Sequence, residues 1–343
     1  MIRYMTAGES HGPALVGIID GIPAGLRLDI AAIDAALAAR QGGHGRSRRQ
    51  QIEHDTIEFL AGLRGGVTLG SPLAVIIRNR DFENVRALMD PLTGSGQPIT
   101  RPRPGHADYA GGLKFRHTDL RNVLERASAR ETAMRVALGE IARQYLAVFG
   151  ITVRGFVFQI GDVRAGDVVE LPDSDSVGDS PVRCPDAAAS ALMVERIDRA
   201  KKDGDTLGGA FELRATGMPV GIGSNRQPGD RLGARIAAAM MSIQTVKAVE
   251  IGEGITTSGY VGSKSHDTFE PADGKVRRGS NRAGGIEGGM SNGEDLVIRV
   301  RVKPIATLMK PLASVDLTTG GAAPATIVRS DVCAVPAASV IGE

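Results

Sequence analysis

Two histidines lie in short loops whose neighbouring residues suit chemistry on an anion. His11 stands between glycines in GESHG, residues 8–12, directly after Ser10. Glycine lets a ligand approach the backbone closely, so this loop suits an anion that must receive a proton. His106 lies in RPRPGHADY, residues 101–109, where prolines restrict the backbone on both sides. A loop histidine is more often simply solvated, but this rigid position makes His106 a second candidate for proton transfer.

GESHG also matches G-x-S-x-G, the pattern of the nucleophile elbow in serine hydrolases. An elbow serine requires a strand before it and a helix after it. Only seven residues precede Gly8, and the run that follows, residues 14–19, is typical of a strand. We therefore reject Ser10 as a hydrolase nucleophile.

Arginine is concentrated in polar segments. The chain has 33 arginines against 8 lysines, and arginine binds phosphate and carboxylate groups through two parallel hydrogen bonds. Arg40 precedes QGGHGRSRR, residues 41–49, which holds three more arginines. A second cluster, ERASARET at residues 125–132, could instead be a helix face held by its own salt bridges. Because stacking aromatic residues are scarce, a small polyanion fits these arginines better than RNA does.

The composition narrows the class of protein. Of 343 residues, 45 are glycine, about twice the usual share, and there are 8 Phe, 4 Tyr and no Trp. The glycines lack the every-third-residue period of collagen, and 42% hydrophobic residues exclude a disordered linker. A net charge of +2 gives no strong field for nucleic acid or an anionic membrane. A globular protein remains.

Cysteine usage and the N-terminus indicate a compartment. The two cysteines, Cys184 and Cys333, lack CxxC spacing and fit a reducing environment. The N-terminus has no signal-peptide pattern, and no apolar run is long enough to span a membrane. No zinc spacing, Walker A or G-x-G-x-x-G motif occurs. We expect a cytoplasmic protein without a metal site, in which an unusual fold would hold any nucleotide cofactor.

Hydrophobic periodicity predicts the elements that must position these residues. The predicted strands are 14–19, 73–77, 151–158, 210–213 and 296–302. The predicted helices are 29–40, 122–149, 186–202 and 231–249. Because helices and strands do not alternate regularly, we predict a layered α+β fold rather than a doubly wound parallel sheet.

A weak internal repeat points the same way. Residues 12–25 read GPALVGIIDGIPAG and residues 208–221 read GGAFELRATGMPVG, and both place a glycine nine residues before a G-x-P-x-G turn. Such short matches arise by chance or else indicate a duplicated sheet with pseudo-two-fold symmetry.

Three long polar segments, 41–54, 79–109 and 262–292, are predicted to be functional loops. The last, rich in paired glycines, is predicted to cover a ligand rather than to link domains.

Several motifs together resemble one family. GESHG, RPGHADY, ERASARET, NRAGGIEGGMSNG, KPIAT and RSDVCAVPA occur in the order found in chorismate synthases, and the resemblance runs from Met1 to Glu343. It implies a single domain, residues 1–343, folded as a β-α-β sandwich of antiparallel sheets around a helical layer, and a homotetramer. It also implies an anti-1,4 elimination of phosphate from 5-enolpyruvylshikimate 3-phosphate to give chorismate. This lyase reaction of the shikimate pathway, which leads to the aromatic amino acids, needs reduced FMN without net redox change.

The resemblance further implies roles for individual residues. His11 would protonate the departing phosphate, His106 would protonate the reduced flavin, and Asp331 would manage a proton near flavin N5. The implied substrate-binding residues are Ser10, Arg40, Arg46, Arg49, Ser128, Arg130 and Arg329. The implied FMN-binding residues are Arg126, Ala127, Ser128, Gln244, Thr245, Gly288, Lys303, Pro304, Ile305, Ala306, Thr307 and Arg329. Arg40 and Arg46 also match positions that the family links to NADP, although the role in substrate binding is the better founded.

Three points stay open from the sequence. Family members usually continue beyond the VIGE segment through a C-terminal helix, whereas this sequence ends at Glu343; loss of that helix would weaken oligomer packing. The flavin could be reduced on this chain by NADPH or by an outside reductase. A polyanion- or RNA-binding protein that uses the arginine segments is the alternative to the enzyme.

Overall fold

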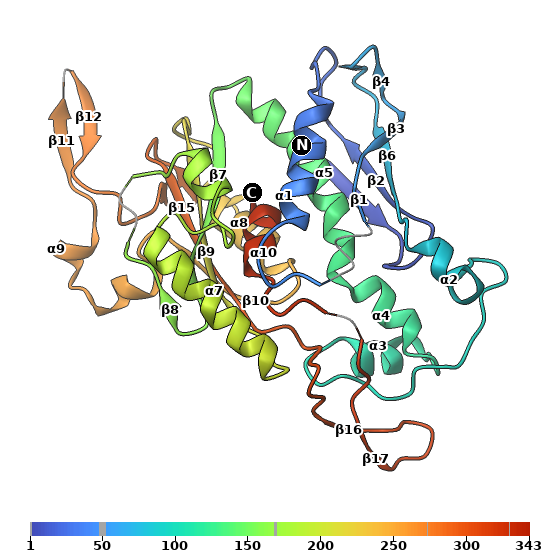
Figure 1. Ribbon diagram of the computed structural model, residues 1–343. Coiled ribbons are helices and arrows are strands. Elements are labelled where there is room, and N and C mark those ends of the chain that lie inside the picture. Colours follow the sequence, from blue (N-terminus) through green and yellow to red (C-terminus); the bar gives the residue numbers. More distant parts are fainter. Residues whose placement is uncertain (1, 48–52, 168–169, 273, 329) are drawn as a thin grey trace.

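Two antiparallel sheets enclose a layer of helices (Figure 1). The computed structural model describes residues 2–343 apart from 48–52, 168–169, 273 and 329. The first sheet has the strand order β1 (Arg3–Ala7), β2 (Ala14–Asp20), β6 (Leu73–Arg78), β3 (Glu58–Ala61). The second has the order β10 (Val246–Ile251), β15 (Leu296–Val302), β9 (Gly209–Thr216), β7 (Thr152–Ile160), β8 (Val163–Arg164). The predicted α+β fold is therefore confirmed.

Three helices lie between the sheets: α1 (Ile30–Gln41), α5 (Thr132–Ala147) and α10 (Val335–Gly342). Helix α5 contacts β1, β2 and β6 of the first sheet and β7 of the second, while α10 contacts β7 and β9. Helix α7 (Ala187–Lys202) packs beside β7 and β8. It begins where predicted, because the side chain of Asp186 caps it by accepting a hydrogen bond from the backbone N–H of Ala189.

The remaining elements are short. The helices are α2 (Phe82–Met89), α3 (Asp108–Phe115), α4 (Arg121–Ala127), α6 (Ser174–Gly178), α8 (Leu232–Met241) and α9 (Gly262–Ser265). The 3-10 turns are η2 (Ala129–Glu131), η3 (Pro228–Asp230) and η4 (Gly254–Gly259). The hairpins pair β4 (Leu63–Arg64) with β5 (Val67–Thr68), β11 (Phe269–Ala272) with β12 (Lys275–Arg278), β13 (Ile286–Glu287) with β14 (Met290–Ser291), and β16 (Ala313–Val315) with β17 (Ala322–Pro324). The polar segments 79–109 and 262–292 are thus less irregular than predicted.

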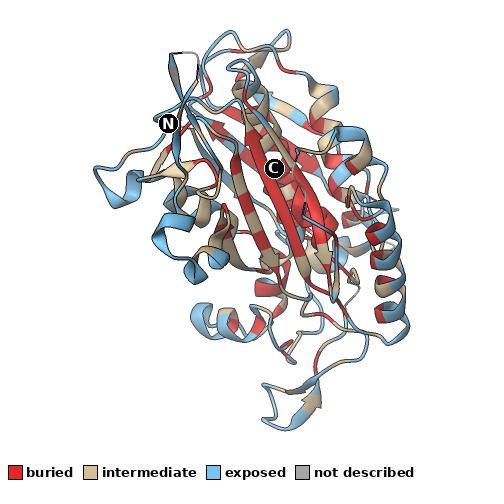
Figure 2. Cartoon of the chain, turned by 90° about the vertical axis from the view of Figure 1, so that its left-hand side faces the viewer, coloured by how far each residue is buried: buried red, intermediate tan, exposed pale blue. Residues whose placement is uncertain are grey.

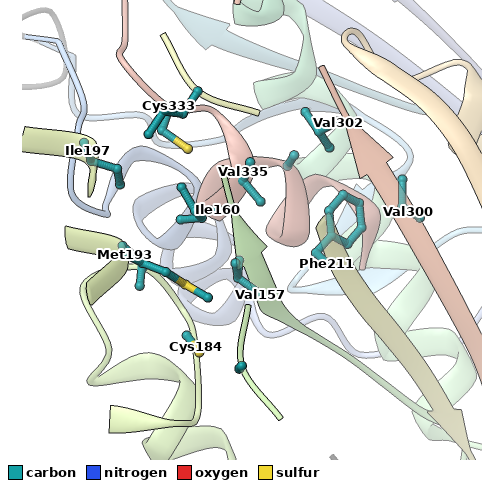
Figure 3. Close-up of a cluster of buried hydrophobic side chains, with 14 of the residues drawn as sticks. Val157, Ile160, Cys184, Met193, Ile197, Phe211, Val300, Val302, Cys333 and Val335 are labelled. Carbon is teal, nitrogen blue, oxygen red and sulfur yellow. The ribbon is translucent and has the colours of Figure 1, made fainter. Parts of the chain in front are cut away.

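The hydrophobic core follows from strand alternation. In β15, Leu296, Ile298, Val300 and Val302 are buried and the residues between them are half-buried, the period-two pattern of a strand with one face on the core. The central strands of the second sheet are accordingly largely buried (Figure 2). The core of this sheet includes Phe211, Met193 and Cys333 (Figure 3). Each fully buried large side chain of this kind stabilises the fold by roughly 1.5–3 kcal/mol.

Helix α10 joins the two halves of the core. Val335 and Ala338 pack in the cluster of the five-stranded sheet, whereas Val340 packs in the cluster of the four-stranded sheet. The helix is buried over almost its whole length. The two sheets therefore share one central layer.

The predicted long helix 122–149 is wrong in its middle. Helix α4 ends at Ala127, Ser128 is extended (φ −63°, ψ 141°), and a 3-10 turn leads into α5. The Ser128 hydroxyl accepts a hydrogen bond from the backbone N–H of Arg130. Serine competes for backbone donors in this way and so favours caps over helix interiors. The break places residues 128–130 at the junction of two helices.

The predicted helix 231–249 is wrong in its second half. Helix α8 ends at Met241, Thr245 has a left-handed backbone (φ 72°), and β10 begins at Val246. Residues 246–251 pair with β15. Sheet pairing with β15 outweighs the helical pattern, because Val246, Val249 and Ile251 are β-branched and favour a strand.

The two repeated segments adopt similar local structures. Strands β2 and β9 each end directly before a G-x-P-x-G turn, and the glycines at both ends of each turn, 21 and 25 or 217 and 221, have positive φ. Glycine adopts this conformation without steric cost. The pseudo-two-fold symmetry of the whole fold stays a prediction.

Candidate active site

His11 is held by a carboxylate on helix α4. Its Nδ1 lies 3.0 and 2.9 Å from the two side-chain oxygens of Glu125, and its backbone N–H donates to the same carboxylate. The Asp81 carboxylate lies 3.9 Å from Nε2, on the other side of the ring. Neighbouring Ser10 is buried and accepts a hydrogen bond from the Ser128 hydroxyl. The GESHG loop is therefore anchored to the α4–α5 junction.

His106 is held by a second carboxylate, at the start of α3. Its Nδ1 lies 2.5 Å from Oδ1 of Asp108, and the Arg103 guanidinium donates to both oxygens of this carboxylate. Burial alone would raise the pKa of Asp108, but the hydrogen bonds from His106 and Arg103 outweigh it and hold the pKa well below its usual range. Asp108 is thus ionised, and it fixes the imidazole ring of His106.

The C-terminal turn of α4 contributes the predicted cofactor residues 126–128. The Arg126 guanidinium donates to the backbone oxygens of Thr6 and Gly8. It therefore ties the strand that leads into the His11 loop to the same helix. Ala127 and Ser128 follow at the helix end, where small side chains leave the backbone accessible.

Arg40 is a buried cation among cations. It donates to the Thr132 hydroxyl and to the backbone oxygen of Ala129, and only 4% of its surface is exposed. Burial, followed by the nearby charges of Arg46 and Arg130, lowers the pKa of Arg40 to about 9. Since arginine normally keeps its proton, this shift means that the charge of Arg40 is under-compensated. A bound anion would supply the missing negative charge.

Arg130 and Arg46 already have carboxylate partners. Arg130 donates two hydrogen bonds to Asp55, at 2.5 and 2.7 Å, and two more to Oδ1 of Asn79. Arg46 lies 2.6 Å from Oδ2 of Asp331, whose other oxygen accepts from the backbone N–H of Ser47. The predicted proton-handling residue Asp331 therefore lies in the arginine cluster. The predicted residues Arg49 and Arg329 lie outside the described residues.

The KPIAT segment, residues 303–307, meets the His106 loop and the end of α8. The Lys303 ammonium donates to the backbone oxygen of Gly105 (2.6 Å). The Lys303 backbone N–H donates to the backbone oxygen of Thr245 (2.9 Å). The Thr307 hydroxyl accepts from Arg103 (2.7 Å), and the Ile305 carbonyl accepts from Thr206. Pro304 and Ala306 complete this segment. It directly follows β15, so the sheet fixes its starting point.

Gln244 connects this segment to the α4–α5 junction. Its Nε2 donates to Oε1 of Glu131 at 2.6 Å, and the same carboxylate accepts a hydrogen bond from the Thr6 hydroxyl. Its Oε1 is buried and has no hydrogen-bond partner among the described residues. A buried acceptor without a partner is costly, so a ligand that offers an N–H group would be stabilised here.

The structure does not bring Gly288 to this cluster within one chain. Gly288 is the turn between β13 and β14, which lies beside the start of β15, whereas Lys303 follows its end. Seven strand residues separate these ends, about 20 Å at the usual rise per residue. A ligand-covering role for the 262–292 segment on the cluster of the same chain therefore finds no support.

The sequence interpretation missed the carboxylates that orient the predicted residues. Glu125, Asp108, Asp55 and Glu131 are buried, and each holds a predicted site residue. Two signals were available, because Asp108 follows His106 by two residues and Glu125 immediately precedes Arg126. Asp55 carried no such signal.

A separate cavity of about 420 Å³ lies at the C-terminal end of β10, beside Ile251. Its lining includes Thr257, His266, Asp267, Phe269 and Arg282, and none of the predicted site residues. In the part of the chain that the structure describes, no three His, Cys, Asp or Glu side chains are arranged to hold a metal ion. No described helix is long and apolar enough to cross a membrane.

Two antiparallel sheets around a helical layer, with two carboxylate-held histidines beside buried arginines, define an α+β enzyme that acts on a small molecule. The family model described as chorismate synthase matches residues 2–343. The chain belongs to the chorismate synthase family, and its activity is that of a carbon–oxygen lyase.

Relatives and a solved structure agree with this assignment. The chorismate synthase of Symbiobacterium thermophilum is 55% identical over 356 aligned residues, which cover 100% of this chain and 90% of that protein. That of Desulforudis audaxviator is 53% identical over 350 residues, with the same coverage. A solved structure titled "Crystal Structure of Chorismate Synthase" superposes with a TM-score of 0.76 at 39% identity, covering 100% of this chain and 88% of that one. The comparisons give no support to a polyanion- or RNA-binding protein.

Proposed function

We propose that this chain eliminates phosphate from 5-enolpyruvylshikimate 3-phosphate to give chorismate, with reduced FMN as cofactor and no net redox change. The observation that carries the proposal is the buried guanidinium of Arg40, which donates to Thr132 and to the Ala129 backbone but forms no ion pair with a carboxylate among the described residues. Helix α5 and the Ser128–Ser10 contact connect this charge to the His11 loop. The substrate has one phosphate and two carboxylates; these anions would pair with Arg40 and compete with Asp331 for Arg46.

The chain's own residues bind the substrate and move a proton. Arg40 and Arg46 orient the anionic groups, while Ser10 and Ser128 offer hydroxyl groups at the helix junction. His11 then donates a proton to the departing phosphate, which makes phosphate a better leaving group. Arg130 keeps Asp55 and Asn79 in place beside this site, and its direct contact with substrate stays a prediction.

The residues around Gln244 fit a flavin. The Oε1 of Gln244 has no hydrogen-bond partner within the described ranges, so it would accept the kind of N–H group that a flavin ring carries. Lys303 and Arg126 would supply positive charge for the flavin's phosphate. The other residues that would hold it are Ala127, Ser128, Thr245, Pro304, Ile305, Ala306 and Thr307. When bound, reduced FMN supplies electron density for cleavage of the C–O bond and takes up the hydrogen that leaves carbon.

Two residues would control protons near the flavin. His106 is oriented by Asp108 through Nδ1, so its other ring nitrogen is available to give a proton to the reduced cofactor. Asp331 would take part in proton handling near flavin N5, and in the structure it is paired with Arg46. Its release from that pair would accompany substrate binding, because both anions compete for the same guanidinium.

The assembly and the source of electrons belong to the same proposal. We expect a homotetramer in the cytoplasm, and NADPH as a possible source of electrons for the flavin. Gly288 can serve the same flavin only if a neighbouring copy supplies it, since it lies at the opposite end of β15 from Lys303. A homotetramer is compatible with this arrangement.

An anaerobic assay tests the proposal. Purified chain, chemically reduced FMN and 5-enolpyruvylshikimate 3-phosphate are expected to give phosphate and chorismate in equal amounts, followed by phosphate release and chorismate absorbance. Folded protein that forms neither product would contradict the proposed reaction. A parallel assay under air with NADPH and oxidised FMN shows whether the chain reduces its own flavin.

A further inference from the structure

Glu125 is an unusual buried carboxylate in this chain. It lies in the last turn of α4, and only 4% of its surface is exposed. The structure describes seven buried carboxylates: Glu53, Asp55, Asp108, Glu125, Glu131, Glu212 and Glu250. Six of them form an ion pair with an arginine. Among the described ion pairs, Glu125 has only His11 as a cationic partner.

The contacts of Glu125 all lie on the His11 loop. Both carboxylate oxygens lie within 3.0 Å of His11 Nδ1, and Oε2 also accepts from the His11 backbone N–H at 2.8 Å. The Glu125 backbone oxygen accepts from the N–H of Ser10 at 3.0 Å. The neighbouring guanidinium of Arg126 is turned instead to the backbone oxygens of Thr6 and Gly8. Nothing in these contacts neutralises Glu125 except the imidazole ring.

This geometry decides which ring nitrogen carries the fixed proton. An ionised carboxylate only accepts hydrogen bonds, so Nδ1 must be the donor. Nε2 is then the nitrogen that gains and loses a proton. It points away from Glu125, with Asp81 3.9 Å away.

Resting on the proposed function, we propose that Glu125 is a positioning residue for His11. It fixes the orientation of the ring and keeps a proton on Nδ1, so that Nε2 delivers the proton to the phosphate. In that step the N–H bond at Nε2 breaks and an O–H bond forms on the phosphate oxygen. The ring is left neutral, and its Nδ1–H still donates to Glu125. A carboxylate performs the same orienting task for the histidine of serine-protease triads.

The test uses Glu125→Gln in the enzyme supplied with reduced FMN. The amide is nearly isosteric; its oxygen accepts from the His11 backbone N–H, and its NH₂ group then donates to Nδ1. This arrangement forces the neutral ring to carry its proton on Nε2 and removes the stabilisation of the doubly protonated ring. We expect kcat to fall by about 10²-fold or more, with KM changed by less than about threefold, because substrate binding is retained. Glu125→Asp keeps the charge and is expected to recover part of the loss.

Nitrogen-15 NMR of labelled histidine reads the tautomer directly. The chain has six histidines, and the His11 signals are assigned as those absent from His11→Asn. The neutral ring of His11 is expected to carry its proton on Nδ1 in the wild type and on Nε2 in Glu125→Gln. A merely structural role for Glu125 would leave the ring tautomer unchanged.

Glu250→Gln provides a matched control. Glu250 is also buried and binds Arg301 at 2.8 Å, but it lies in the five-stranded sheet. This variant is expected to lose stability while kcat, KM and the His11 tautomer stay unchanged.

The proposal is overturned if folded Glu125→Gln keeps kcat within about threefold of the wild type. It is also overturned if kcat falls with no change in tautomer, or if wild-type His11 carries its neutral proton on Nε2. The NMR measurement needs no turnover. A wild type that forms no chorismate would therefore contradict the proposed function, while the role of Glu125 would still be decided.

Discussion

At the scale of single residues, the predicted side chains are held by partners within the chain. Glu125 holds His11, Asp108 holds His106, and Asp331 holds Arg46. Such support fixes side chains near the geometry that catalysis needs, so less order has to be gained in the transition state. The two histidines differ in one respect, because Arg103 shares the carboxylate of His106 whereas no described arginine pairs with Glu125.

The two histidines can be tested by truncation. His11→Ala and His106→Ala are each expected to lower kcat by about 10²-fold or more, the usual contribution of a positioned acid or base. His117→Ala is the control, since His117 is exposed on the surface, and its kcat is expected to stay at the wild-type value. Unchanged turnover in His11→Ala or His106→Ala, measured anaerobically with reduced FMN, would remove that residue from the mechanism.

Arg40 links ligand binding to stability. Because burial and the neighbouring arginines lower the pKa of Arg40, keeping its positive charge in the folded state costs stability. Replacement by an apolar side chain of similar length removes the cost.

Thermal unfolding of Arg40→Met measures this effect. At pH 7 and without ligand, the variant is expected to unfold at the same temperature as the wild type or higher, because the cost of the buried cation is removed. Inorganic phosphate should raise the Tm of the wild type and have a smaller effect on the variant. A variant that is less stable than the wild type at pH 7 and gains equally from phosphate would show that Arg40 is no anion site.

At the scale of elements, helix α5 carries both packing and chemistry. Its first turn adjoins Arg40, and its middle packs on β2 at Gly17, where an added Cβ would lie 2.4 Å from Met134 Sδ and 3.1 Å from Leu138 Cδ1. Glycine at this position lets the helix approach the sheet closely. The position of the α4–α5 junction, and so of Ser128, depends on this contact.

Two glycine substitutions separate close packing from helix propensity. Gly17→Ala is expected to destabilise the fold by about 1–3 kcal/mol, because Met134 is fully buried and must move. Gly139→Ala, in the same region on α5, meets nothing within 4 Å and is expected to stabilise the protein by about 0.5–1 kcal/mol. Urea unfolding measures both, and equal effects from the two substitutions would contradict the close helix–sheet contact.

At the scale of the whole molecule, two cysteines report whether the core of the five-stranded sheet stays packed. Burial raises the pKa of Cys333 to about 12, and burial also raises that of Cys184. The thiolate is the reactive form. Cys333 pairs through its backbone with Leu207, just before β9, so its exposure requires the chain's C-terminal segment to leave the five-stranded sheet.

Alkylation with iodoacetamide at pH 8 tests this packing. Neither cysteine is expected to react in the folded protein, and both should react fully in denaturant. Gly17→Ala should speed the reaction only if the two cores unfold together, as the shared helix α10 predicts. Rapid labelling of Cys333 in the native wild type would be incompatible with the packing described.

Much of the element pattern followed from the sequence alone. The strand 296–302 and the helix 186–202 were predicted correctly, because each depends on a local signal: a run rich in β-branched residues in one and the Asp186 cap in the other. The long helix 122–149 failed at Ser128 and the helix 231–249 failed at Val246. In both places a contact with a distant segment, Ser10 or β15, competes with the local helical pattern.

The sequence by itself determined the chemistry of the site, which depends on two histidines, an excess of arginine and small residues in loops. Its motifs also determined the family. Only the tertiary structure decided the partners. It joined Glu125 to His11 across 114 residues, Asp55 to Arg130 across 75 and Asp331 to Arg46 across 285, and it set Gly288 apart from Lys303 along β15. Residue type and spacing determine only local structure, because they act between neighbours in the sequence. A buried charge needs an opposite charge or hydrogen bonds nearby, and the fold can bring these partners from any part of the chain.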